Sequence, residues 1–360
     1  MVTLSDISSL PTLAAGVTVG DLGEAALIDR IRRRVPPAPD WVTTGIGDDA
    51  AVIEPARGTL DVVTTDTLVE GIHFERSFVS AADLGYKTLA VNLSDLAAMG
   101  ATPRVVVLSL VLPAAMAAAD LDTLVGGVLT LANRHQVVLV GGNITRSSGP
   151  LVLGMTAIGA VRRRRVLTRA GGRPGDELWV TGTLGGAAAG LACLQRDPAG
   201  PPEADGDLAG CVERYRRPDP RVRIGTLLGR NRAARAVVDL SDGLGDGLRQ
   251  LTQACHVGAV VDGAAVPIDT GARRWFETQG LDPLDAALAG GDDYELLVAV
   301  PRTHRRRFAA VRRLARGVPI TRIGELTTDT ALVLRTRDGD RPLPPGYQHF
   351  ETAHAPPAPS

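Results

Sequence analysis

Aspartate-rich turns recur at five separated places in this chain of 360 residues, four of them beside a predicted strand or a glycine and the fifth within a predicted helix. They are Gly47-Asp48-Asp49, Thr64-Thr65-Asp66, Asn92-Leu93-Ser94-Asp95, Asp239-Leu240-Ser241-Asp242 and Gly291-Asp292-Asp293-Tyr294-Glu295. Any one of them alone is explained by the preference of Asp and Gly for turns and helix caps. Carboxylates gathered in one place repel one another unless cations lie between them. If the fold brings these turns together, we therefore expect a metal site.

The donor atoms of these turns select the kind of metal. Oxygen ligands from Asp, Thr and Ser, without a His or Cys cluster, favour a hard cation, chiefly Mg²⁺. The stretch "DLSDGLGDG", which begins at Asp239, does not have the spacing of a calcium-binding EF-hand. Nor does it match G-x-G-x-x-G, because Leu248 stands where the third glycine is needed. Asp246 in this stretch is expected to be an ordinary acid in the first turn of the following helix.

Glycine turns suited to phosphate accompany the aspartates. Gly141-Gly142-Asn143 follows a predicted strand, and a second turn, 182–186, joins a strand to an Ala-rich segment. Backbone N–H groups at such turns can face an anion, although tight strand–helix packing explains the second turn equally well. Arg146 and Arg169 lie near these turns in the sequence and could pair with phosphate oxygens, but either alone is typical of a surface residue.

Composition excludes several classes of function. The net charge is −1, and the only block of one sign is Arg162–Arg165, so neither nucleic-acid nor membrane-surface binding is expected. Lys87 is the only lysine, and Tyr86 precedes it, which excludes a Walker A loop. Three cysteines without C-x-x-C spacing, and the lack of a recognisable signal peptide, favour a cytoplasmic protein.

Hydrophobic periodicity predicts two mixed domains, of α/β or α+β type, with a boundary near residue 162. Helices are expected at 23–35, 80–100 and about 114–134, the second with Ser80 as its N-cap and Gly100 as its C-cap. Strands are expected at 60–71, 105–112, 136–143 and 151–161. After the boundary, strands at 177–182 and 236–243 each lead into a helix, and 197–207 has the composition of a surface loop.

Five segments, in this order, resemble the thiamine-monophosphate kinase family. They are "GIGDDAAV", "TTDTLVEGIHF", "GYKTLAVNLSDLAAMGATP", "DLSDGL" and "GGDDYELL". The family shares its superfamily with aminoimidazole ribonucleotide synthetase and selenophosphate synthetase. The resemblance extends from about residue 20 to 350, and "EGIHF" together with "AVNLSDLAAMGA" is far more specific than any single Asp turn.

The resemblance implies that ATP phosphorylates thiamine monophosphate to thiamine diphosphate with several Mg²⁺ ions. It implies an α+β homodimer that pairs the sheets of N-terminal domains, with the nucleotide between the N- and C-terminal domains. The expected organisation is a flexible extension 1–20, a Mg/ATP-binding and dimerisation domain 21–161, a C-terminal α/β domain 162–350 and a disordered tail 351–360. The family's metal positions fall on Asp48, Thr64, Thr65, Asp66, Asp95, Asn143, Asp239 and Asp242. Its nucleotide contacts fall on Gly142, Arg169 and Ser241, and its substrate contacts on His73, Asp292 and Tyr347.

Two of these positions depart from the family's usual residues. Asn143 stands where the family has Asp, and Asp292 where it commonly has Glu, which bears on one metal's affinity and on the substrate fit. No cysteine occurs before Cys193, which argues against a selenophosphate synthetase. An aminoimidazole ribonucleotide synthetase, or a non-catalytic nucleotide-binding relative with Asn143 as a damaged ligand, remain the alternatives. A lone His73 is also commonly structural or solvent-exposed.

Overall fold

The structure is a computed structural model that describes residues 13–14, 16–201 and 205–344. Tyr347, the expected tail and most of the expected N-terminal extension lie outside these residues. The helices are α1 Val19–Leu22, α2 Glu24–Arg34, α3 Ala81–Ala98, α4 Ala118–His135, α5 Gly186–Arg196, α6 Gly206–Arg216, α7 Val222–Asn231, α8 Leu244–Cys255, α9 Thr270–Thr278, α10 Pro283–Ala289 and α11 Arg305–Leu314. Single 3₁₀ turns lie at Arg163–Arg165, Gly263–Ala265 and Arg302–His304. The strands are β1 Val42–Thr44, β2 Val52–Ile53, β3 Leu60–Val69, β4 Thr102–Pro113, β5 Val138–Ser147, β6 Val152–Val161, β7 Glu177–Thr181, β8 Ala236–Leu240, β9 Gly258–Asp262, β10 Glu295–Val300, β11 Ile320–Thr327, β12 Leu332–Thr336 and β13 Gly339–Pro342.

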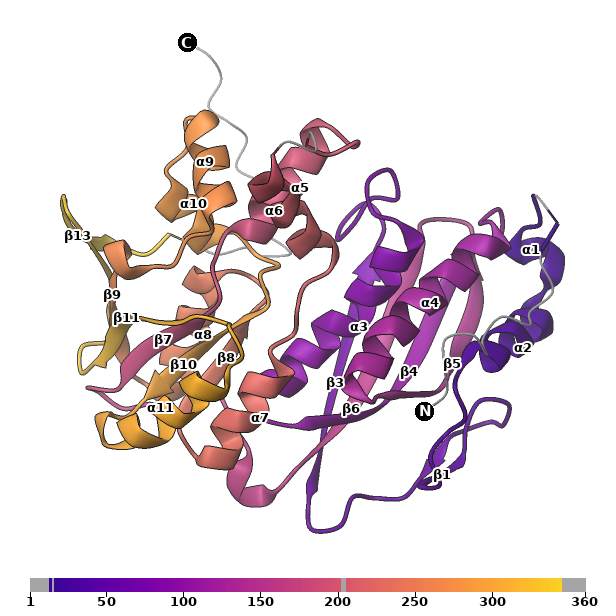
Figure 1. Cartoon of the computed structure of the whole chain (residues 1–360), viewed down its shortest axis with the longest axis horizontal. Coiled ribbons are helices and arrows are strands. Elements are labelled where there is room, and N and C mark those ends of the chain that lie inside the picture. The colour runs from indigo at the N-terminus through magenta and orange to yellow at the C-terminus, as the bar shows by residue number, and fades with distance from the viewer. Residues whose placement is uncertain (1–12, 15, 202–204, 345–360) are drawn as a thin grey trace.

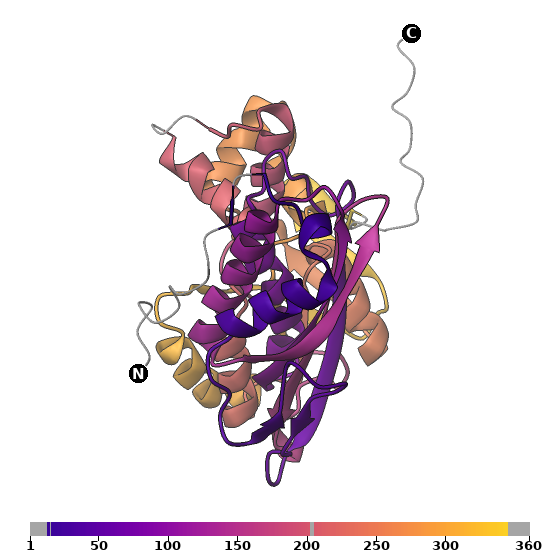
Figure 2. The same cartoon turned by 90° about the vertical axis from the view of Figure 1, so that its right-hand side faces the viewer.

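A four-stranded sheet forms the first half of the molecule. Its order is β3-β6-β4-β5, antiparallel except for the parallel pair β4 and β5. Helices α3 and α4 cover one face of this sheet (Figures 1 and 2). The two helices approach closely because a Cβ on Gly85 would lie 1.9 Å from the carbonyl oxygen of Leu124, and one on Gly127 would lie 1.9 Å from that of Ala82. Glycine at both positions therefore sets the spacing of the layer that backs the sheet.

Helix α3 is the central element of the fold, and it was predicted from the sequence. The Ser80 hydroxyl accepts a hydrogen bond from the Asp83 N–H at 3.1 Å, which confirms the predicted N-cap. The C-cap prediction was wrong by one residue, because Met99 caps the helix and Gly100 follows it with φ +68°. Nearly every side chain of α3 is buried, including Lys87 and Ser94. Buried polar groups need partners, and those of Lys87 and Ser94 belong to the second half of the chain.

A seven-stranded sheet of order β13-β12-β9-β11-β7-β10-β8 forms the second half. All its pairings are antiparallel except β9 with β12. Edge strand β8 and helix α7 lie against α3, which separates the two halves in Figure 1. The contact with α7 is close, since a Cβ on Gly225 would lie 2.0 Å from the carbonyl oxygen of Ala97. One helix of the first half thus packs on both sheets.

Mixed sheets and helices in both halves confirm the predicted α+β class. Strand β5 is longer than predicted, because it continues past the glycines to Ser147. The expected loop at 197–207 includes the start of α6, and residues 202–204 lie outside the described chain. Within the described residues, no helix is both long and apolar enough to cross a lipid bilayer.

Candidate active site

Aspartates from both halves of the chain meet where α3 touches the end of β8. Thr64 and Asp66 lie on the same face of β3, because side chains alternate along a strand, and α3 packs on that face. The Thr64 hydroxyl donates a hydrogen bond to Asp95 of α3. The Ser94 hydroxyl donates to Asp239 Oδ2, at the end of β8, over 2.9 Å. We call Thr64, Asp66, Asp95 and Asp239 the junction cluster.

The junction cluster carries negative charge that its surroundings do not balance. Burial, with the charges of Asp95 and Asp242, raises the pKa of Asp66 to about 6. Burial, followed by the charge of Asp95, raises the pKa of Asp239 to about 7. Burial also raises the pKa of Asp95, although Thr64 and the positive charge of Arg169 oppose this. Ionised carboxylates at this place are therefore destabilising until a further cation arrives.

The donor set of the junction cluster fits a hard divalent cation. All its donors are carboxylate or hydroxyl oxygens, the ligands that Mg²⁺ prefers. Among the described residues, no three His, Cys, Asp or Glu side chains are gathered in a way that would hold a metal by themselves. Mg²⁺ usually keeps several waters and takes only one or two carboxylates beside the phosphates of a substrate. An open group of aspartates suits that mode of binding better than a closed cage.

A pocket of about 450 Å³ opens beside the cluster, between the two halves. Five residues predicted for the site line it, and they come from β3, from the loop after it and from two loops of the second half: Asp66, His73, Ser241, Asp242 and Asp292. Helix α5 supplies much of the remaining wall through Ala188 and Leu191. The fold thus brings together predicted metal, nucleotide and substrate positions that are more than 200 residues apart in the sequence.

His73 is fixed by the backbone around it. The Val69 N–H donates to His73 Nδ1 over 3.1 Å, so the neutral ring carries its proton on Nε2. The hydroxyl of Tyr215, on α6, donates to the His73 carbonyl oxygen over 3.2 Å. His73 therefore has structural partners and also lines the pocket, so that the two interpretations of this residue are compatible.

Lys87 is a pocket residue that the sequence analysis did not assign to the site. Its side chain is only 1% exposed, and its Nζ lies 2.9 Å from Oδ2 of Asp292. The sequence singled out Lys87 only as a rare residue. It is the one lysine among the 39 lysines and arginines of the chain. That observation served only to exclude a Walker A loop. Its pairing with a residue 205 positions away was not visible in the sequence.

Four predicted residues lie apart from the junction cluster, on the uncovered face of the four-stranded sheet. They line a pocket of about 550 Å³: Asp48, Thr65, Gly142 and Asn143. Thr65 faces away from Thr64 and Asp66 because of strand alternation, and its hydroxyl donates to the Met155 carbonyl oxygen over 3.1 Å. A Cβ on Gly142 would lie 2.0 Å from the Leu108 carbonyl oxygen, so the close approach of β4 requires this glycine. The described chain does not gather all predicted ligands in one place.

Of the two interpretations of the turn at 182–186, the structure favours tight packing over a phosphate site. The first turn of α5 already has an anion, because Gly185 and Ala187 donate their N–H groups to the Asp293 carboxylate over 2.6 and 3.1 Å. Gly182 is required by packing, since its Cβ would lie 1.8 Å from Glu295 Oε1. A carboxylate of the chain itself thus occupies the position expected for a ligand.

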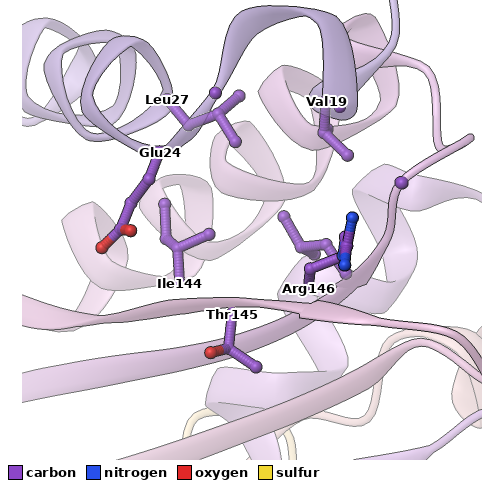
Figure 3. Close-up of a pocket in the computed structure, with 10 residues that line it drawn as sticks. Val19, Glu24, Leu27, Ile144, Thr145 and Arg146 are labelled. Carbon is purple, nitrogen blue, oxygen red and sulfur yellow. The ribbon is translucent and has the colours of Figure 1, made fainter.

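Arg146 also lies away from the pocket between the halves. It lines a cavity of about 240 Å³ between the first helices and β5, together with Val19, Glu24, Leu27 and Ile144 (Figure 3). None of the residues lining this cavity lines the pocket beside the junction cluster. Arg169 differs, because its charge acts on both Asp95 and Asp239. Of the two arginines, only Arg169 is placed to contribute to the junction.

The fold and these sites define a class of proteins related to AIR synthase. Residues 47–161 match the family described as "AIR synthase related protein, N-terminal domain", and residues 173–337 match the corresponding C-terminal domain. Within this class, the chain belongs to the thiamine-monophosphate kinase family. The thiamine-monophosphate kinase of Escherichia coli K12 is 41% identical over 335 residues, which cover 92% of this chain and 99% of that protein.

Further relatives agree with this assignment. The thiamine-monophosphate kinase of Bacillus subtilis 168 is 32% identical, over 86% of this chain and 94% of that protein. The crystal structure of thiamine-monophosphate kinase from Stenotrophomonas maltophilia K279a superposes with a TM-score of 0.77 at 40% identity, and covers 87% of this chain and 96% of that one. A structure of AaThiL complexed with AMPPCP and TMP gives a TM-score of 0.72 at 29% identity, over 94% of this chain and 100% of that one.

Proposed function

We propose that this protein uses ATP to phosphorylate thiamine monophosphate to thiamine diphosphate. Relatives that align over most of both chains are named for this activity, and one solved relative is in complex with TMP and with AMPPCP, which is an analogue of ATP. The observation within this chain that carries the proposal is the junction cluster at the wall of a pocket between the halves. Two anionic substrates can meet there only where cations and fixed dipoles offset their charge.

We assign the cations to the aspartates of the junction. Asp66, Asp95, Asp239 and Asp242, with Thr64, would hold Mg²⁺, and Mg²⁺ would neutralise the phosphate oxygens of both substrates. Arg169 adds a fixed positive charge on the same side, since its charge acts on Asp95 and Asp239. Ser241 lies beside Asp242 in the pocket wall and is assigned to the nucleotide. The chain's own contribution is thus to position and enclose the reacting phosphates.

No protein base is needed for this reaction. The acceptor is a phosphate monoester whose second pKa is about 6, so its attacking oxygen is already ionised near neutral pH. We propose direct in-line transfer, with His73 and Asp292 contacting the acceptor rather than accepting the phosphoryl group. Tyr347 remains a predicted acceptor contact outside the described residues. Isolation of a covalently phosphorylated protein during turnover would contradict direct transfer.

The residues on the uncovered sheet face belong to the proposed homodimer. Val63 is 63% exposed and Val107 is 36% exposed on this face, beside Thr65 and Asn143. A second copy of the sheet placed here would cover these valines and enclose the pocket that Asp48 lines. Asp48, Thr65 and Asn143 as further metal ligands, and Gly142 as a nucleotide contact, are proposals that depend on this enclosure.

The proposed organisation follows the sequence prediction. Residues 21–161 would form the Mg/ATP-binding and dimerisation domain, and residues 162–350 the C-terminal domain. A cytoplasmic location is proposed, and the cysteine pattern supports it.

Formation of ADP that depends on thiamine monophosphate tests the function. Purified protein is incubated with ATP and Mg²⁺, with and without thiamine monophosphate, and ADP and thiamine diphosphate are separated by chromatography. We expect the two products in equal amounts, and loss of both in Asp242→Asn. Bound ATP without turnover would instead favour a non-catalytic relative. Turnover only with a ribonucleotide precursor of the aminoimidazole would favour the synthetase alternative.

A further inference from the structure

Lys87 connects the two halves of the molecule at the wall of the pocket. It lies on α3, is 1% exposed, and reaches Asp292 in the loop before β10. Its Nζ also lies 3.8 Å from the centroid of the Tyr215 ring, a favourable contact between a cation and an aromatic face. The ammonium thus has one partner in the loop before β10 and one on α6.

Asp292 is held in an unusual backbone conformation. Its φ is +66° and that of Tyr294 is +50°, in the left-handed region that L-residues rarely adopt. The Asp292 N–H donates to the Ser241 carbonyl oxygen over 2.7 Å, and the Tyr294 hydroxyl donates to Asp292 Oδ1 over 3.0 Å. Backbone strain of this kind persists where surrounding contacts enforce it, and it is concentrated at functional sites.

A contribution to the stability of the folded protein does not explain the Lys87–Asp292 ion pair well. Removing an ammonium group from water costs several kcal/mol, and a buried pair often contributes no more than well-packed apolar residues would. The Asp292 side chain, in contrast, is 31% exposed, on the side where it lines the pocket. One carboxylate oxygen accepts a hydrogen bond from Lys87 and the other accepts one from Tyr294. Each oxygen therefore keeps a lone pair with which it can accept a hydrogen bond from a ligand. The partners of Asp292 therefore fix its direction without using up its capacity to accept hydrogen bonds.

From this geometry we infer that Lys87 is a positioning residue for the acceptor substrate. It holds the Asp292 carboxylate toward the pocket, where that carboxylate recognises an acceptor that has a cationic heteroaromatic ring and, on a second ring, an exocyclic amine. Lys87 also offsets the charge of Asp292, so the carboxylate repels the phosphate of the acceptor less than an unpaired one would. This inference rests on the proposed function, because that function supplies an acceptor with an aminopyrimidine and a thiazolium ring.

Steady-state kinetics of Lys87→Met provide the test. We expect KM for thiamine monophosphate to rise about tenfold or more, the scale of a lost charge-assisted hydrogen bond, with KM for ATP changed by less than about twofold. In an Asp292→Asn background the same substitution should raise the acceptor KM by less than about twofold, because Lys87 acts through Asp292. Equal effects on both substrates, or full additivity with Asp292→Asn, would overturn the inference.

A matched control uses another cation that links the same two helices. Arg217, the C-cap residue of α6, pairs with Asp83 at the start of α3, and neither residue lines the pocket. Arg217→Met should leave the acceptor KM unchanged, whereas an increase equal to that of Lys87→Met would show a general effect of loosening α3. If thermal unfolding shows that Lys87→Met does not fold, Lys87→Gln replaces it and the same criteria apply.

A binding measurement separates the inference from the proposed function. Isothermal calorimetry of thiamine monophosphate, without ATP, compares the wild-type protein with Lys87→Met. If the wild-type protein binds but does not turn over, the proposed function fails while weaker binding by Lys87→Met still supports the inference. If turnover is normal and the two proteins bind equally, the inference alone fails.

Discussion

Replacing Asp239 by Asn should stabilise the metal-free protein while abolishing its activity. Asp239 is 6% exposed, and burial together with Asp95 raises its pKa from 3.8 to about 7. A shift of one unit in a pKa corresponds to about 1.4 kcal/mol. Ionising this carboxyl in the folded protein therefore costs up to about 4 kcal/mol. Since the neighbouring carboxyls share the remaining protons, we expect the variant to gain about 2 kcal/mol at pH 8.

The pH dependence of this gain has a definite sign. A carboxyl whose pKa is raised in the folded state keeps its proton to a higher pH than in the unfolded chain. Between about pH 4 and 7 the folded state therefore binds more protons, and the stability of the wild-type protein falls as the pH rises. The advantage of Asp239→Asn should be largest above pH 7 and should disappear as the pH falls toward 4. The Asn side chain can still accept the hydrogen bond from Ser94.

Thermal or urea unfolding in EDTA, repeated with Mg²⁺ at several pH values, measures this effect. Mg²⁺ should stabilise the wild-type protein more than the variant. The control is Asp246→Asn, seven residues further along, where Asp246 pairs with Arg249 at 3.1 Å in the first turn of α8. That control should keep the wild-type response to Mg²⁺. A variant of Asp239 that is less stable at pH 8, or that retains near-normal turnover, would refute the assignment of this residue to a cation site.

Three further outcomes are expected. Asn143→Asp should lower the Mg²⁺ concentration for half-maximal activity by about threefold or more, because a charged ligand replaces a neutral one; an unchanged Mg²⁺ titration would exclude Asn143 as a ligand. Asp293→Ala should cost about 3 kcal/mol in urea unfolding, because it leaves two N–H groups at the start of α5 without their acceptor and removes one of three carboxylates around Arg214; a loss below about 1 kcal/mol would contradict that role. Val63→Arg should convert the proposed dimer to monomer in light scattering, and an unchanged mass would place the contact elsewhere.

Local patterns in the sequence predicted most elements of the first half and two strand–helix units of the second half. Ser80 and the run of apolar residues after it indicated α3, and alternating β-branched residues indicated β3. Asp246 was predicted as a first-turn acid, and it lies in the first turn of α8. Each of these features depends on residues that are close together in the sequence. Hydrophobic periodicity and capping patterns report on contacts of this local kind.

Contacts between distant segments could not be predicted in the same way. Thr64 and Thr65 are adjacent in sequence, but the pleat of β3 sends one toward Asp95 and the other to the opposite face. The turn at 182–186 has the composition of an anion site, and only the fold shows that Asp293 is the anion. Composition indicates which chemistry a segment can perform, whereas the packing of distant elements decides which partner it receives.

The junction between the two halves combines attraction at one end with repulsion at the other. Lys87 and Asp292 form an ion pair across it, and Ser94 and Asp239 form a hydrogen bond. Asp66 and Asp95 of the first half face Asp239 of the second, and each raises the pKa of that carboxyl. Without a cation, ionisation of these groups opposes the contact between the halves, whereas a cation bound among them would favour it. If Mg²⁺ binds there as proposed, its binding would be thermodynamically linked to the contact between the halves, so a phosphate substrate that arrives with Mg²⁺ would strengthen that contact.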